Sequence, residues 1–177
     1  MTTEYLLNEQ VDHVLALLTP ENRLAMRVAL HTGLRISDVL SLKKTDIDKG
    51  LQFGITEGKT GKRRRVTLTK PLWEDLRNCC GSVWVFQSRI DPAKHRSRQA
   101  VWRDVKRAQE ALRLPQNIGP HSARKIYAVQ LMEDFGSIEK VRRALNHSND
   151  STTMIYVMAA AMLKAKYAKK RRRKKNP

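Results

Sequence analysis

Acidic residues are scarce in this sequence. Its 177 residues include 17 Asp and Glu against 35 Lys and Arg, which gives a formal net charge of +18. So large an excess of positive charge predicts a polyanionic partner, and nucleic acid is the commonest one. The 41% of hydrophobic residues is too high for a disordered basic polypeptide. We therefore expect one folded, basic domain with a substantial core.

Cysteines and long apolar runs are also few. The two cysteines, Cys79 and Cys80, are adjacent, which supports neither a zinc site nor a disulfide framework and favours a reduced, cytosolic compartment. No apolar run approaches the roughly 18 residues of a transmembrane helix, and the opening MTTEYLLNEQ lacks a signal-peptide pattern. The sequence predicts a soluble cytoplasmic protein with no membrane partner.

A glycine-rich nucleotide-binding loop is missing as well. TEGKTGKRRR resembles a Walker loop only superficially, because it lacks the Gly-Lys-Ser/Thr ending and lies in a hairpin context rather than before a helix. We therefore expect no ATPase activity. No other motif in the sequence predicts a cofactor or a metal.

Apolar spacing along the chain predicts a mostly helical domain. Two β-prone runs, 51–56 and 64–69, flank a Gly- and Lys-rich connection and indicate a hairpin, to which 83–86 could add a strand. Residues 43–50 are predicted to form a loop. The fold class is therefore α+β, mostly α-helical with one small antiparallel sheet. The predicted helices are 8–18, 20–32, 36–42, 71–78, 97–112, 121–132, 137–145 and 151–163. In the helix over 97–112, the residues predicted to face the core are Val101, Trp102, Val105 and Leu112.

The last segment, residues 164–177, is a basic tail. KAKYAKKRRRKKNP holds nine Lys and Arg and no acid. It is either a nonspecific phosphate anchor or an element with a specific role. Without these nine side chains the rest of the chain keeps 26 basic residues (35 − 9) against 17 acidic ones, or +9. The body of the protein is thus basic without its tail.

Several polar residues are candidates for chemistry, although each has an ordinary interpretation. Arg35 could be a solvated arginine beside Asp38, and Lys59 lies at a turn, where charged residues are common. His121 and Arg124, in GPHSARK, are three residues apart at a helix start and so share one face. A helix N-terminus also favours bound phosphate.

A second histidine and a tyrosine complete the set. LNHSNDSTTMIY places His147 and Tyr156 nine positions apart. A tyrosine on an amphipathic helix is more often a packing residue than a nucleophile. Taken together, the residues provide what metal-free phosphodiester chemistry requires: two guanidiniums, imidazoles, a lysine acid and a hydroxyl nucleophile.

The order of these residues resembles the catalytic domain of the tyrosine recombinases, the phage-integrase type of DNA breaking and rejoining enzyme. HTGLRISDVLSLKKTDID is similar to the family's first arginine motif, with Arg35 as the catalytic arginine and Asp38 as its acidic helper. EGKTGKRRRVTL resembles the hairpin that carries the catalytic lysine, here Lys59. The resemblance covers about residues 8–163.

The two later motifs resemble the family with small departures. PHSARKIYA gives His121 and Arg124, and LNHSNDSTTMIYVMA gives His147 and the nucleophile Tyr156. HSAR stands where the family has His-Asp/Glu-Leu-Arg, and LNHS replaces the commoner Leu-Gly-His. Both departures keep the chemical residues. Further predicted DNA-binding residues are Lys62, Arg63, Arg64, Arg65 and Lys125.

The resemblance implies a mechanism. Tyr156 would attack a DNA phosphate to form a 3′-phosphotyrosyl bond, while Arg35 and Arg124 hold the phosphoryl oxygens in a bidentate geometry that lysine cannot reproduce. Lys59 would protonate the departing 5′-oxygen.

Two histidines complete the implied mechanism. His147 would hydrogen-bond a non-bridging oxygen, and His121 would assist proton transfer from the tyrosine. The covalent link conserves the bond energy, so neither ATP nor a metal is implied.

The resemblance also implies a domain plan and partners. Residues 1–163 would form the catalytic domain and 164–177 the tail, with the family's N-terminal core-binding domain absent, as in a fragment or a minimal enzyme. The partner would be double-stranded DNA, on which a free monomer assembles as a tetramer, in a bacterial or phage-encoded system. Two alternatives remain: a type IB topoisomerase-like enzyme that relaxes supercoils, and a catalytically silent DNA-binding regulator.

Overall fold

A computed structural model of the chain describes residue 6 and residues 8–146. The predicted helix over 151–163, the basic tail, and the predicted site residues His147 and Tyr156 lie outside the described residues. In chain order, the elements are α1 (Asn8–Leu17), α2 (Pro20–Thr32), α3 (Ile36–Leu40), α4 (Lys44–Ile47), β1 (Gln52–Thr56), β2 (Arg63–Thr67), α5 (Lys70–Cys79), α6 (Arg98–Ala111), α7 (Pro120–Phe135) and α8 (Ile138–Ala144).

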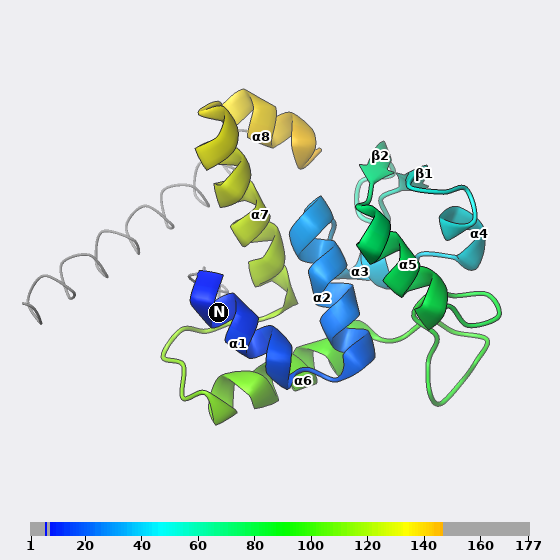
Figure 1. The fold of residues 1–177 in the computed structure, drawn as a ribbon, viewed down its shortest axis with the longest axis horizontal. Coiled ribbons are helices and arrows are strands. Elements are labelled where there is room, and N and C mark those ends of the chain that lie inside the picture. Colours follow the sequence, from blue (N-terminus) through cyan, green and yellow to red (C-terminus); the bar gives the residue numbers. More distant parts are fainter. Residues whose placement is uncertain (1–5, 7, 147–177) are drawn as a thin grey trace, which may run out of the picture.

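Helix α2 runs through the middle of the molecule. It packs against α7 on one side and against α3 and α5 on the other, with α1 also in contact (Figure 1). Pro20 occupies its first turn, where a missing N–H costs nothing. Gly33 ends it in the left-handed region, with φ of 65°, and its N–H donates to the carbonyl of Ala29. Both boundaries agree with the sequence prediction.

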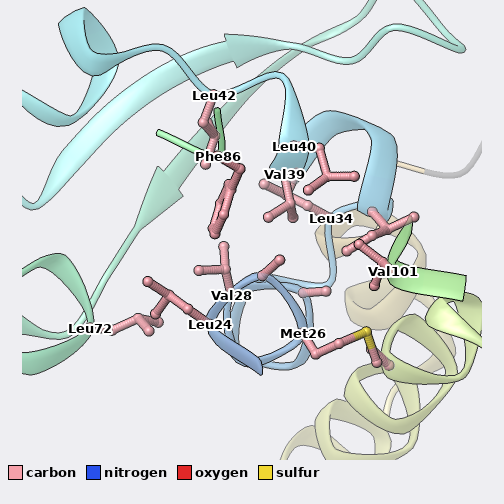
Figure 2. Packing of buried hydrophobic residues seen from close by; sticks show 14 of the residues in the cluster. Leu24, Met26, Val28, Leu34, Val39, Leu40, Leu42, Leu72, Phe86 and Val101 are labelled. Carbon is pink, nitrogen blue, oxygen red and sulfur yellow. The ribbon is translucent and has the colours of Figure 1, made fainter. Parts of the chain in front are cut away.

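The core gathers around α2, α3 and the segment that follows α5. Figure 2 shows Val28 of α2, Val39 of α3 and Phe86 packed together, all at most 1% exposed. Fully burying a side chain of this kind contributes roughly 1.5–3 kcal/mol. Because α3 is a single short helix, this packing is what holds its first residue, and Arg35 just before it, in place.

The predicted hairpin is confirmed. Strands β1 and β2 pair antiparallel, from Gln52 opposite Thr67 to Thr56 opposite Arg63. Phe53 and Ile55 alternate inward along β1, as a half-buried strand requires. The connecting turn is closed by the N–H of Glu57, which donates to the carbonyl of Lys62 at 3.0 Å. The hairpin therefore presents residues 57–62 at one end.

Three details of the sequence prediction were wrong. Residues 83–86 form no strand, and the backbone pairing of Trp84 with Lys43 is an isolated bridge. The expected loop over 43–50 contains α4, a single turn in which the carboxylate of Asp46 accepts the N–H of Lys43 at 3.1 Å. Trp102 does not face the core: it is 48% exposed, whereas Val101 beside it is buried.

A buried polar cluster fixes the start of α2 to α6. Oδ2 of Asp104 accepts the N–H of Thr19 at 2.9 Å and the side-chain amide of Asn22 at 2.7 Å, and Oδ1 accepts from Arg107 at 2.6 Å. Burial alone would raise the pKa of Asp104, but the hydrogen bonds from Asn22, Arg107 and Thr19 outweigh it and lower the pKa to about 2.

We predict that Asp104 contributes pH-dependent stability. Since its folded pKa is depressed, the contribution is present above the unfolded value near 4 and is lost as the pH falls towards 2. Asp104→Asn should lower the free energy of unfolding by about 2 kcal/mol at pH 7, and by progressively less between pH 4 and 2. Urea unfolding at several pH values measures this difference.

The exposed pair Asp75–Arg27 provides the matched control, since both side chains are more than 40% exposed. Asp75→Asn should change stability by less than about 1 kcal/mol. A loss at Asp104→Asn that stayed constant down to pH 2 would contradict the assignment.

Candidate active site

One pocket brings together four of the six residues predicted to be catalytic. It has a volume of about 500 Å³. Arg35, Lys59, His121 and Arg124 all line it, although they come from three separate parts of the chain. The other lining residues are Leu34, Ile36, Ser37, Arg98, Gln99, Trp102 and Pro120.

The end of α2 sets the position of Arg35. Gly33 adopts φ of 65°, which glycine allows at no steric cost, and the chain then reverses into α3. A Cβ on Gly33 would lie 2.2 Å from the ring of Tyr127 on α7. The turn that leads to Arg35 is thus pressed directly against α7, and both the backbone angle and the close approach require glycine.

Arg124 is held by backbone carbonyls and is only 1% exposed. Its Nη1 donates to the carbonyl of Gly33 and its Nη2 to the carbonyl of Leu145, each at 2.6 Å. Carbonyl groups at a helix C-terminus lack intrahelical donors and carry partial negative charge, so they favour a cation. The side chain of Arg124 therefore connects the end of α2 to the residue that follows α8.

Arg35 is oriented by carboxylates. Its Nη1 donates to Oε2 of Glu57 at 2.7 Å and lies 4.0 Å from Oδ2 of Asp38. Asp38 also accepts the N–H of Gly58 at 3.0 Å. Burial raises the pKa of Asp38, and the negative charge of Glu57 raises it further. Both carboxylate contacts use Nη1, and the planar guanidinium has further N–H donors on its other edge.

Sequence reasoning missed Glu57, which is fully buried. Burial alone would raise its pKa, but hydrogen bonds from Arg35 and Thr60 outweigh it and lower the pKa, so the carboxylate is ionised. One signal was available: Glu57 continues the inward alternation of Phe53 and Ile55 along β1. The exposed Trp102 at the pocket was also missed, because helical spacing does not distinguish a core face from a pocket wall.

The predicted basic residues of the hairpin take two different positions. Lys62, Arg63 and Arg65 are exposed, like Lys59 at the turn. Arg64 is turned inward: its guanidinium donates to the carbonyl of Thr32 and lies 3.5 Å from Glu57. Its contact with DNA stays a prediction.

Lys125 on α7 was also predicted to contact DNA. It is half-buried and follows Arg124 directly, and its contact with DNA stays a prediction.

His121 lies at the start of α7 with an exposed side chain. Despite that exposure, the protein around the ring removes part of its hydration, and the positive charges of Arg124, Lys125, Arg35 and Lys59 add to the effect. Together they lower its pKa to about 4. The imidazole is therefore neutral near pH 7 and can accept a proton.

Among residues 8–146, there is no group of three or more His, Cys, Asp or Glu side chains that could hold a metal ion. Within the same residues, no helix has both the length and the apolar character to cross a membrane. The lining of the pocket is rich in cations, and two carboxylates contact one of them, Arg35, an arrangement suited to a phosphate.

The comparisons with known proteins agree with this geometry. The sequence profile of the phage integrase family matches residues 4–162, so the chain belongs to the phage integrase family. Tyrosine recombinase XerD of Mycobacterium tuberculosis is 28% identical over 156 residues, which cover 80% of this chain and 49% of that protein. A tyrosine recombinase of Thermosipho africanus is 30% identical over 178 residues, 94% of this chain and 61% of its own length.

Solved structures show the same fold. A lambda integrase dimer bound to a core site has a TM-score of 0.72 at 22% identity, over 87% of this chain and 59% of that one. The catalytic domain of bacteriophage HP1 integrase has a TM-score of 0.68 at 21% identity and 89% coverage of both chains. The predicted fold class is confirmed. The chain spans about half the length of the XerD relatives that it matches.

We predict that His121 titrates far below an ordinary histidine. Its Cε1 proton signal in NMR should shift with a midpoint near pH 4 in the free protein, because the surrounding protein removes hydration from the ring and a proton added to it meets four nearby cations. Loss of the signal in His121→Gln assigns it. A short DNA duplex should move the midpoint upward, since a phosphate offsets the positive charge. A midpoint near 6.5, unchanged by DNA, would contradict the described surroundings of the ring.

Proposed function

We propose that this chain is the catalytic domain of a site-specific DNA recombinase or integrase, an enzyme that cuts and rejoins DNA through a 3′-phosphotyrosyl intermediate. The observation that carries the proposal is the convergence of Arg35, Lys59, His121 and Arg124 on one pocket. Membership of the phage integrase family supports the same chemistry.

In the proposed cleavage step, the hydroxyl oxygen of Tyr156 forms a bond to the phosphorus and the bond from phosphorus to the 5′-oxygen breaks. Arg35 and Arg124 hold the non-bridging oxygens and stabilise the charge that develops on them. The carbonyl contacts of Arg124 fix its position before substrate arrives, so less reorganisation is needed during the reaction.

Proton transfers accompany both bond changes. A tyrosine hydroxyl has a pKa of about 10, so it needs activation. His121 is the proposed acceptor of that proton: its ring is neutral in the free protein, and the negative charge of a bound phosphate would raise its pKa toward the working pH. Lys59 protonates the leaving 5′-oxygen, and His147 hydrogen-bonds a non-bridging oxygen. Attack by the freed 5′-hydroxyl of another strand reverses the steps and rejoins the DNA.

Double-stranded DNA is the proposed substrate. Lys62, Arg63 and Arg65 of the hairpin are exposed, as is Lys59. Exposed basic side chains neutralise backbone phosphates and make binding salt-dependent. Arg64 and Lys125 are the two further proposed DNA contacts.

Assembly is proposed from the relatives. One lambda integrase structure is described as a tetramer bound to a Holliday junction. By analogy, this chain would be a monomer when free and a tetramer on DNA. Residues 1–163 would form the catalytic unit, and the basic tail would add phosphate contacts. Relaxation of supercoils by a monomer, or DNA binding without cleavage, are the alternatives that the experiment must separate.

We predict a covalent DNA adduct that depends on Tyr156. A pool of nicked duplexes incubated with the protein in EDTA should give a slowly migrating band on a denaturing gel, because the short released strand diffuses away and the adduct is trapped. Tyr156→Phe should abolish the band and leave binding within about twofold, since the ring is kept and only the hydroxyl is lost. Tyr127→Phe is the matched control and should keep the adduct.

Each outcome of this experiment separates the candidates. Salt-sensitive binding without any adduct would identify a silent DNA-binding protein. An adduct formed on every sequence in the pool, together with supercoil relaxation, would favour the topoisomerase-like enzyme. Sequencing of the trapped DNA should instead return a defined site.

A further inference from the structure

Glu57 is the most deeply placed charged group beside the pocket. It follows β1 directly, at the start of the turn that carries Lys59, and its side chain is 0% exposed. Oε2 accepts from Nη1 of Arg35 at 2.7 Å and from the hydroxyl of Thr60 at 3.1 Å. Oε1 lies 3.5 Å from Nη1 of Arg64. This carboxylate is therefore enclosed by the protein.

Burying a carboxylate is costly, and stability alone does not explain it. Removing an ion from water costs several kcal/mol, and a buried ion pair is often no more stabilising than well-packed apolar residues of similar volume. Here burial would raise the pKa of Glu57, but the hydrogen bonds from Arg35 and Thr60 and the positive charge of Arg124 outweigh it and lower the pKa. The specific gain is orientation, because a hydrogen-bonded carboxylate restricts the planar guanidinium of Arg35.

The position of Glu57 also connects two separate parts of the pocket. Arg35 precedes α3, whereas Lys59 lies on the hairpin turn two residues after Glu57. The bond from Arg35 to Glu57 joins these parts, and the bond from the Gly58 N–H to Asp38 is a second link in the same place. The contact with Thr60 fixes the residue on the far side of Lys59.

We propose that Glu57 is a positioning residue for the cleavage reaction: it holds the guanidinium of Arg35 and the turn that carries Lys59 in their working places without contacting DNA. The expected effect of Glu57 on cleavage rests on the proposed function. In this arrangement Asp38 holds the backbone of the turn by accepting the N–H of Gly58, and Glu57 holds the side chain of Arg35.

The kinetic test compares Glu57→Gln and Glu57→Ala with the wild-type protein in single-turnover cleavage of a nicked duplex. Glu57→Gln should slow cleavage roughly 10- to 100-fold, since a misplaced reacting group costs about this much, while DNA affinity changes less than about twofold. Glu57→Ala should be slower still, because glutamine keeps an oxygen that can accept from Arg35. Asp104→Asn is the control: it removes a buried carboxylate charge from a residue that does not line the pocket and should leave the cleavage rate of folded protein unchanged.

A second measurement does not depend on activity. The Nε–H signal of Arg35 in NMR, assigned by its loss in Arg35→Lys, should show a restricted guanidinium in the wild-type protein and faster rotation in Glu57→Ala, which has no oxygen to accept from Arg35. A guanidinium equally restricted in these two proteins, or cleavage by Glu57→Ala at the wild-type rate, would overturn the inference. If the wild-type protein forms no adduct but Glu57→Ala still releases Arg35, the positioning role stands and the proposed cleavage activity fails.

Discussion

The C-terminal end of α2 is the constraint on which the rest of the site depends. Its last carbonyl groups have no donors within the helix and carry the negative end of the helix dipole. In this protein the carbonyls of Thr32 and Gly33 accept from Arg64 and Arg124 respectively. Gly33 then turns the chain so that Arg35 follows two residues later. One helix end thus fixes three guanidiniums that the sequence places far apart.

Charge balance explains how these guanidiniums can lie close together. Arg35, Arg64 and Arg124 repel one another, and Glu57 and Asp38 offset part of that repulsion from behind. Three guanidiniums against two carboxylates leave an excess of positive charge, to which Lys59 adds at the mouth of the pocket. A phosphate that enters meets donors already in place, which is the electrostatic preorganisation that phosphoryl chemistry requires.

Patterns of neighbouring residues in the sequence predicted the helix ends and the hairpin that build this arrangement. Thr19-Pro20 and Gly33 gave the two ends of α2 correctly, and the alternation around Phe53 predicted the hairpin. The role of Glu57 could not be predicted in this way, because its partner Arg35 lies 22 residues away and a charged residue at a turn is usually solvated. Trp102 was misplaced for a related reason: an amphipathic helix shows which residues share a face, but not whether a pocket or the core lies against it.

The central claim is that this pocket serves a covalent tyrosine intermediate, and the most direct test is to locate the covalent bond. After reaction with a nicked duplex, nuclease and trypsin digestion would leave a peptide that carries a short nucleotide, which mass spectrometry can sequence. We expect the nucleotide on Tyr156, joined through its 3′-phosphate. A nucleotide on any other residue, or attached through a 5′-phosphate, would contradict the account.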